Sequence, residues 1–270
     1  SGDDQRLLLN HVFVNHPSWP NALRLLAIFH DDLYQPLPML SFQLNYAKAG
    51  PHPTGAFAVS PYGFHLTNIL LHAANALLVA LVAARLAGCR RIGILTGLMF
   101  ACHPFALEPI AWISGRMILL ATLFSLLMFL GLPLRAEDEK GSSPILAIVA
   151  WLFSLASKAL PTVPFAAFWC DRRRNGTVPR RRWLAYAIMI VMSGAATWMA
   201  YRATNKAGFI EGMQSEAVSP MPVRVLLASR YYLENYICPN RLAAWSPPPR
   251  SAYFNLLRDP KEETNVATEE

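Results

Sequence analysis

Long apolar runs separated by short charged stretches organise this chain. Since a helix needs roughly 20 residues to cross a bilayer core, six runs are interpreted as membrane segments. They are residues 66–87, 92–107, 117–134, 144–157, 159–170 and 183–201. The fourth and fifth are short and divided at Lys158 and Pro161, which favours a hairpin of two tilted or broken helices over one long helix. The pattern predicts an all-α integral membrane protein with about six transmembrane helices.

Basic residues occupy alternate loops between these runs. The loops contain Arg85, Arg90 and Arg91, then Arg135 and Lys140, then an arginine block at 172–174 and 180–182. Cytoplasmic loops of membrane proteins are enriched in Lys and Arg, so these loops are predicted to face the cytoplasm and both ends of the chain to lie outside. A single helix over 144–170 would break the alternation. If the source is bacterial, the protein belongs in the inner, cytoplasmic membrane.

The outer segments carry shorter amphipathic patterns. Residues 5–14 and 21–29 place apolar side chains at helical spacing, which predicts short helices on the membrane surface. A similar stretch at 223–237 precedes a polar, acidic end that is expected to fray. The predicted organisation is an outer loop with amphipathic helices at 1–61, a transmembrane bundle at 62–202 and an outer C-terminal segment at 203–270.

Composition supports the membrane class. Hydrophobic residues make up 54% of the chain and charged residues 15%, which excludes a disordered chain and disfavours a cytosolic enzyme. The net charge of +7 does not predict a nucleic-acid partner, because six arginines form one block between two apolar runs. The four cysteines contain no C-x-x-C pair, so neither a zinc site nor a disulfide framework is expected.

Polar side chains form a stripe on the first membrane segment. His65, Asn68, His72 and Asn75 follow one another at intervals of three, four and three residues, which places them on one helical face. Because polar groups are costly in lipid, the stripe should face the bundle interior. Hydrogen bonding between helices is its most frequent role. His65 and His72 are about 10 Å apart along the axis, too far to share one metal ion.

The outer loop 102–116 concentrates specific residues. Glu108 and Arg116 are the only formal charges between Arg91 and Arg135. One interpretation is an ion pair at the membrane surface. The other is a site for an anionic, lipid-borne substrate, since a guanidinium binds phosphate well. Lys158 is predicted on the same side, either as a second positive charge or as an interface anchor.

Several strings resemble a known family. They are Tyr34 to Tyr46 (YQPLPMLSFQLNY), Tyr62 to His72 (YGFHLTNILLH), His103-Pro104, Glu108 to Arg116 (EPIAWISGR) and Ser157-Lys158. Together they resemble the membrane half of the transmembrane-and-tetratricopeptide-repeat protein O-mannosyltransferases and their bacterial relatives, which are GT-C glycosyltransferases. The resemblance runs from about residue 3 to residue 242. No tetratricopeptide repeats follow here, and the family's membrane domain continues further than this chain.

The resemblance implies specific roles. In the family an acidic pair follows the first membrane helix. Asp3-Asp4 matches this acidic pair, and Asp31-Asp32 matches it less well. The resemblance then implies that the first membrane helix would lie just before Ser1. One carboxylate would take the proton from the acceptor hydroxyl. The candidate catalytic residues are Asp3, Asp4 and Glu108, and the candidate substrate-binding residues are Arg116, Lys158, Arg230 and His103. No metal ligands are predicted, although a requirement for a divalent metal stays open.

Two functions compete. The first is a GT-C-like glycosyltransferase, or a remnant of one, that transfers a sugar from a polyprenyl-phosphate donor to a protein hydroxyl. The alternative is a non-catalytic accessory or structural subunit of a larger membrane complex. A transporter ranks third, because the stripe has no charged partners in the other segments. The expected partners are membrane lipids, the lipid-linked sugar and, for the alternative, other membrane subunits, but not nucleic acid.

Overall fold

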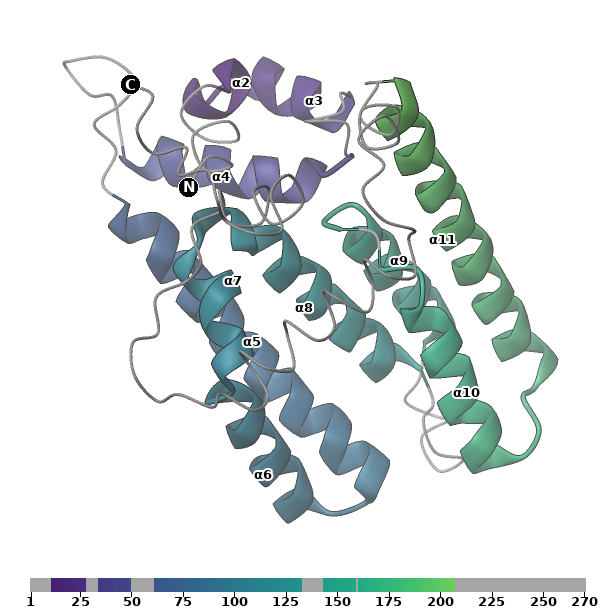
Figure 1. Ribbon diagram of the computed structural model, residues 1–270. Helices are drawn as coiled ribbons and strands as arrows, with labels where there is room; N and C mark the ends of the chain where they lie inside the picture. The colour runs from purple at the N-terminus through teal and green to yellow at the C-terminus, as the bar shows by residue number, and fades with distance from the viewer. Residues whose placement is uncertain (1–10, 28–33, 50–60, 133–142, 159, 207–270) are drawn as a thin grey trace, which may run out of the picture. The chain divides into compact units, whose positions relative to one another are not determined.

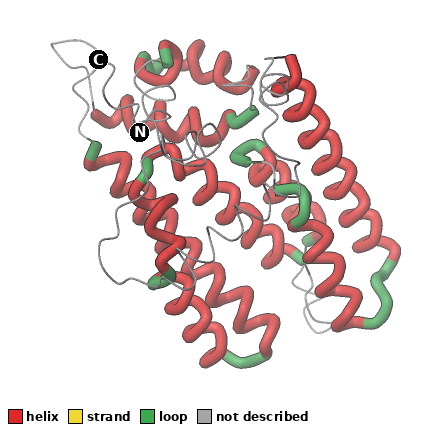
Figure 2. Tube along the Cα trace, viewed as in Figure 1, coloured by secondary structure: helices red, strands yellow, loops and turns green. Residues whose placement is uncertain are grey.

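The computed structural model describes residues 11–27, 34–49, 61–132, 143–158 and 160–206. The chain divides into two compact units after Ala207, and all described residues belong to the first. Within these ranges every regular element is a helix, and Figure 2 draws no strand there. The helices, labelled where there is room in Figure 1, are α2 (Val12–Asn15), α3 (Trp19–Ala27), α4 (Pro36–Ala49), α5 (Tyr62–Ala87), α6 (Arg90–Ala101), η2 (Pro104–Ala106), α7 (Leu107–Ala111), η3 (Ile113–Gly115), α8 (Arg116–Gly131), α9 (Pro144–Leu155), α10 (Val163–Asn175) and α11 (Arg180–Lys206).

Three helical segments are long and apolar enough to cross a membrane, namely Tyr62–Ala87, Ile113–Gly131 and Arg182–Ala200. The pair Arg90–Ala101 and Pro104–Ala111 would make a fourth span with a bend of 58°. Helix α9 is apolar but shorter. The described part of the chain is therefore that of an α-helical membrane protein, whereas the number of six spans and the placement of the ends stay predictions.

Helix α5 runs parallel to α8. At their N-terminal ends, Nη2 of Arg116 donates to the carbonyl oxygen of Phe64 at 2.8 Å. At their C-terminal ends, Nη1 of Arg85 donates to the carbonyl oxygen of Leu130 at 2.6 Å. Two segments separated by one intervening span are expected to have the same direction, so this pairing agrees with the predicted alternation.

Helix α6 runs back alongside α5 (Figure 1), and the two helices pack closely. The turn begins at Gly88, whose φ of 65° is a left-handed conformation that glycine adopts without strain. A Cβ at Gly93 would lie 2.4 Å from the carbonyl oxygen of Ala80, and one at Gly97 would lie 2.7 Å from the Cβ of Ala80. Gly93-x-x-x-Gly97 is thus a small-residue motif that lets two membrane helices approach closely. The sequence interpretation missed this motif.

Helices α8 and α9 are antiparallel neighbours. A Cβ at Gly131, where α8 ends, would lie 3.0 Å from the backbone nitrogen of Ala147. Further along, the Ser154 hydroxyl donates to the carbonyl oxygen of Ala121 at 3.0 Å. The indole N–H of Trp151 then donates to the carbonyl oxygen of Met189 at 3.2 Å, which joins α9 to α11.

The sequence prediction of a break in the segment 144–170 is confirmed. Helix α9 ends at Leu155 and α10 begins at Val163, so the alternative of one long helix is wrong. Proline explains the division, because Pro161 interrupts the helical pattern and Pro164 fits in the first turn of α10, where its missing N–H costs nothing.

The N-terminal helices form an apolar cluster with the start of α5. Val14 of α2, Leu25 of α3 and Met39 and Phe42 of α4 are buried together with Phe64 of α5. Of the two predicted amphipathic segments, residues 12–15 and 19–27 are helical, and residues 5–10 and 28–29 lie outside the described part of the chain. Helix α4 was not predicted from periodicity, although proline at its first residue is a typical start signal.

Candidate functional site

Arg116, the first residue of α8, is completely buried. Its Nε donates to Oδ1 of Asn68 at 2.9 Å, and its Nη2 donates to the carbonyl oxygen of Phe64 at 2.8 Å. Its Nη1 donates to Oδ1 of Asn45, with longer contacts of 3.3 Å and 3.4 Å to the carbonyl and hydroxyl oxygens of Ser41. One guanidinium therefore joins α4, α5 and α8.

Aromatic rings complete the surroundings of this guanidinium. The Cζ of Arg116 lies 4.6 Å from the ring centroid of Phe42 and 5.6 Å from that of Phe64. Within the described ranges no carboxylate pairs with it. Tyr46 lies edge-on to Phe64 at 5.3 Å, and burial raises the pKa of its phenol above the ordinary 10.0, so it is neutral at physiological pH. Neutral dipoles and ring faces, rather than an opposite charge, compensate the Arg116 cation.

Asn68 connects this cation to the loop between α6 and α8. Its Nδ2 donates to the carbonyl oxygen of Trp112 at 2.9 Å and lies 3.4 Å from that of Pro109. Gly115 closes the loop from the other side, because a Cβ there would lie 2.4 Å from the carbonyl oxygen of Pro109. The string Glu108 to Arg116 is thus a compact structural unit. We call residues 103–115 the 103–115 loop, and Asn68 with Arg116 the Asn68–Arg116 clamp.

The prediction that the polar stripe faces inward is confirmed. Asn68 and Asn75 are fully buried, His72 is 8% exposed, and His65 is half-buried. Nε2 of His72 lies 3.2 Å from the carbonyl oxygen of Ala101 on α6, and Nδ2 of Asn75 donates to that of Leu119 on α8 at 3.0 Å. The stripe therefore joins α5 to its neighbours by hydrogen bonds.

The other predicted site residues lie in different surroundings. Glu108 is exposed in the first turn of α7, and His103 is exposed on the same loop, with its ring 5.2 Å from that of Phe105. Lys158 is half-buried just beyond α9, near the point where the backbone N–H of Leu37 on α4 donates to the carbonyl oxygen of Ala156. Asp3, Asp4 and Arg230 lie outside the described residues.

The structure brings together the Asn68–Arg116 clamp and the loop that carries Glu108 and His103. It does not pair Glu108 with Arg116, since Glu108 is exposed and Arg116 is buried and bonded elsewhere. The interpretation as a surface ion pair is therefore wrong. A role for Arg116 in donor binding stays a prediction, and its described hydrogen bonds all go to protein groups.

Two of the Arg116 partners were missed from the sequence. Ser41 and Asn45 are four residues apart, so they lie on one face of α4. This spacing, together with Pro36 as a helix start, is the signal that could have identified α4 and its polar face.

No three His, Cys, Asp or Glu side chains come together as a metal site within the described ranges. Among the predicted substrate-binding residues that the structure describes, Lys158 and His103 have side chains that are at least partly exposed. Glu108 is the described candidate that could accept a proton from a substrate in solution.

Several proteins with similar sequences are named protein O-mannosyl-transferases. Protein O-mannosyl-transferase TMTC4 of Homo sapiens is 37% identical over 111 residues, and Protein O-mannosyl-transferase Tmtc1 of Drosophila melanogaster is 34% identical over 125 residues, covering 36% and 46% of this chain. The chain is a sequence relative of the TMTC protein O-mannosyl-transferases. This confirms the family resemblance.

The match to these TMTC relatives is partial. Protein O-mannosyl-transferase Tmtc2 of Drosophila melanogaster is 32% identical over 177 residues, which is 62% of this chain and 18% of the relative. For Tmtc1 and TMTC4 the covered share of the relative is 14%. No protein-family model and no solved structure matches the chain.

Proposed function

We propose that the protein is a GT-C-like glycosyltransferase that moves a sugar from a polyprenyl-phosphate donor to a protein hydroxyl. The observation that carries this proposal is the sequence similarity to TMTC protein O-mannosyl-transferases. It is supported by an apolar helical bundle and by an exposed carboxylate on a loop that a buried clamp holds.

The proposed topology has six spans with both ends outside. Its support is the direction of the helices: α5 and α8 are parallel, α8 and α9 are antiparallel, and α10 and α11 form a hairpin. In this topology the 103–115 loop and Lys158 face the side where a membrane-anchored donor would present its phosphosugar.

The proposed chemistry needs a base and cationic groups. A carboxylate of Asp3 or Asp4, or that of Glu108, would accept the proton of the acceptor hydroxyl as the glycosidic bond forms. Lys158, Arg230 and His103 would stabilise the phosphate that departs with the lipid. For Arg116 we propose the task of fixing the loop, with direct phosphate contact as the second possibility.

One observation favours the accessory-subunit alternative. Arg116, the cation at the end of the family string Glu108 to Arg116, is buried among neutral protein groups. A subunit that retains the packing of the family but not its sugar-transfer activity would have a buried Arg116 of this kind.

The test measures sugar transfer by membranes that contain the protein, supplied with radiolabelled polyprenyl-phosphate mannose and an acceptor protein. We expect Asp3→Asn, Asp4→Asn or Glu108→Gln to reduce turnover by about 100-fold or more, because an amide keeps the shape but cannot accept the proton. Asp32→Asn is the matched control and should retain turnover. If wild-type membranes transfer no sugar while the protein is folded, the accessory-subunit alternative is correct.

A further inference from the structure

The joined ends of α10 and α11 carry a dense set of exposed cations. Six arginines occupy residues 172–182, against a single acidic residue, Asp171, between residues 160 and 206. Four of the arginine side chains are exposed, namely Arg172, Arg173, Arg174 and Arg180. We call these four the α10–α11 arginine cluster.

Asp171 neutralises one of the remaining arginines inside the protein. It is completely buried, and its Oδ1 accepts from Nη1 of Arg182 at 2.9 Å and from Nδ2 of Asn175 at 2.6 Å. Its Oδ2 accepts from the Tyr186 hydroxyl at 3.1 Å. The carboxylate is thus occupied by internal donors, which leaves the charges of the arginine cluster without an acidic partner among the described residues.

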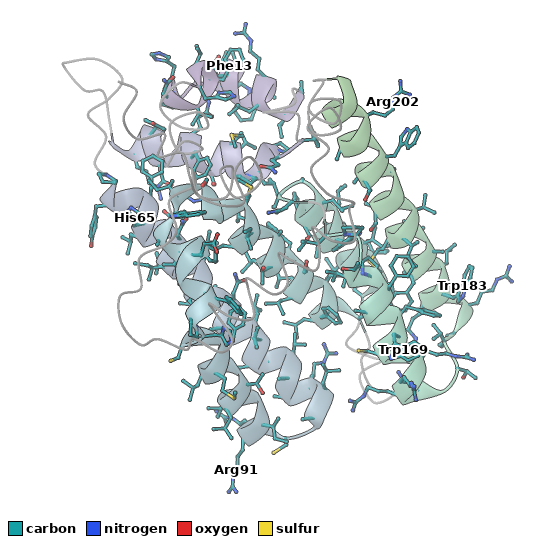
Figure 3. All side chains as sticks on the ribbon, viewed as in Figure 1. Phe13, His65, Arg91, Trp169, Trp183 and Arg202 are labelled. Atoms are coloured by element: carbon teal, nitrogen blue, oxygen red, sulfur yellow. The ribbon has the colours of Figure 1, made fainter. Side chains whose placement is uncertain are left out.

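The cluster lies at the end of a candidate span. The apolar segment of α11 begins at Arg182, two residues after Arg180. Trp169 and Trp183, both labelled in Figure 3, are 60% and 57% exposed, and the Cζ of Arg173 lies 4.8 Å from the Trp169 ring. Exposed tryptophans beside arginines at the end of an apolar helix are typical of the headgroup region of a bilayer.

Helix electrostatics does not account for the whole cluster. Arginines in the last turn of α10 are favourable there, because a helix C-terminus carries partial negative charge. Arg180 begins α11, where the partial charge is positive and a cation is unfavourable. The position of Arg180 is therefore not explained by the helix dipole, and an anion bound at this end would be favourable.

We propose that the α10–α11 arginine cluster is a binding surface for the headgroups of anionic phospholipids. Guanidinium groups bind phosphate oxygens through two parallel hydrogen bonds, and the two tryptophans would lie at the level of the glycerol backbone. Basic clusters next to a membrane span are typical sites of this kind. A lipid fits better than nucleic acid, because the cations are confined to the end of an apolar span. The proposal does not depend on glycosyltransferase activity.

The experiment measures lipid retained by the purified protein. The protein is incubated in detergent with equal amounts of phosphatidylglycerol and phosphatidylcholine and repurified, and the bound lipids are quantified by mass spectrometry. Each arginine near an anionic surface is worth roughly a fivefold change in binding. We therefore expect wild-type protein to favour phosphatidylglycerol strongly, and Arg173→Gln/Arg180→Gln to lower that preference by about tenfold or more.

Two further variants complete the design. Arg90→Gln/Arg91→Gln removes two exposed arginines at the turn between α5 and α6, where no tryptophan lies in residues 85–101. This variant should lower the preference clearly less than Arg173→Gln/Arg180→Gln does. Arg173→Lys/Arg180→Lys keeps the charge and should restore most of the retention. Inorganic phosphate at the same concentration should not displace the lipid. The proposal is overturned if both glutamine variants lose lipid equally, if free phosphate or an oligonucleotide displaces the lipid, or if wild-type protein shows no preference.

Discussion

Replacing Asn68 by leucine tests the Asn68–Arg116 clamp directly. Leucine keeps the branched shape of the side chain but removes the Oδ1 atom that accepts from Nε of Arg116 and the Nδ2 group that donates to the carbonyl oxygen of Trp112. Both bonds lie at a side chain with no exposed surface. The buried guanidinium would then lose one of its acceptors.

The two bonds have different expected strengths. A neutral side-chain hydrogen bond in a membrane protein contributes about 0.6 kcal/mol on average and about 1.7 kcal/mol at most. A hydrogen bond to a charged group contributes about 1.5–3 kcal/mol. The free energy of unfolding of Asn68→Leu should therefore fall by about 2–4 kcal/mol.

Asn75→Leu is the matched control, because Asn75 is equally buried on the same face of α5. Its Nδ2 donates to the carbonyl oxygen of Leu119 at 3.0 Å, but its Oδ1 has no partner. Leucine thus removes one neutral bond and one unsatisfied buried oxygen, and these changes oppose each other. The free energy of unfolding should change by less than about 1 kcal/mol.

Unfolding in mixed micelles with increasing dodecyl sulfate would give both free energies. Hydrogen–deuterium exchange would add a local measurement, since residues 103–115 should exchange faster in Asn68→Leu but not in Asn75→Leu. A difference between the two variants below about 0.5 kcal/mol, which is the usual scatter of such comparisons, would refute the reasoning. The Asn68–Arg116 bond would then contribute no more than an ordinary amide contact.

Three other substitutions have clear expected outcomes in the same unfolding assay. Gly115→Ala should lower the free energy of unfolding by about 1–3 kcal/mol, because its Cβ would meet the Pro109 backbone at 2.4 Å. Gly194→Ala is the control: a Cβ there has nothing within 4 Å, so this variant should be neutral or stabilising. Equal effects of the two variants would contradict the close loop contact. Asp171→Asn should lower the free energy of unfolding by about 3–5 kcal/mol, because Arg182 loses its buried carboxylate partner. A decrease below about 1 kcal/mol would show that this pair is not important for stability.

The candidate site was predictable in its components and not in its connections. The periodicity of α5 predicted that Asn68 and Asn75 face inward, and the loop string identified Arg116. The ion pair with Glu108 was wrong, because closeness in sequence does not show which of two charges becomes buried. Asn45, which accepts from Nη1 of Arg116, is 71 residues from it in the sequence. It lies on α4, a helix that the apolar pattern did not indicate.

The sequence by itself determined the membrane class, the long apolar segments that become helices and the polar face of α5, because length, apolar composition and helical spacing are local properties of the chain. It also determined the break before α10 through proline geometry. It did not determine α4. Tertiary structure alone decided which groups satisfy Arg116 and Asp171 and how closely Gly93 approaches Ala80. A buried charge must find its partners wherever packing brings donors and acceptors together, and that choice depends on contacts between segments far apart in the sequence.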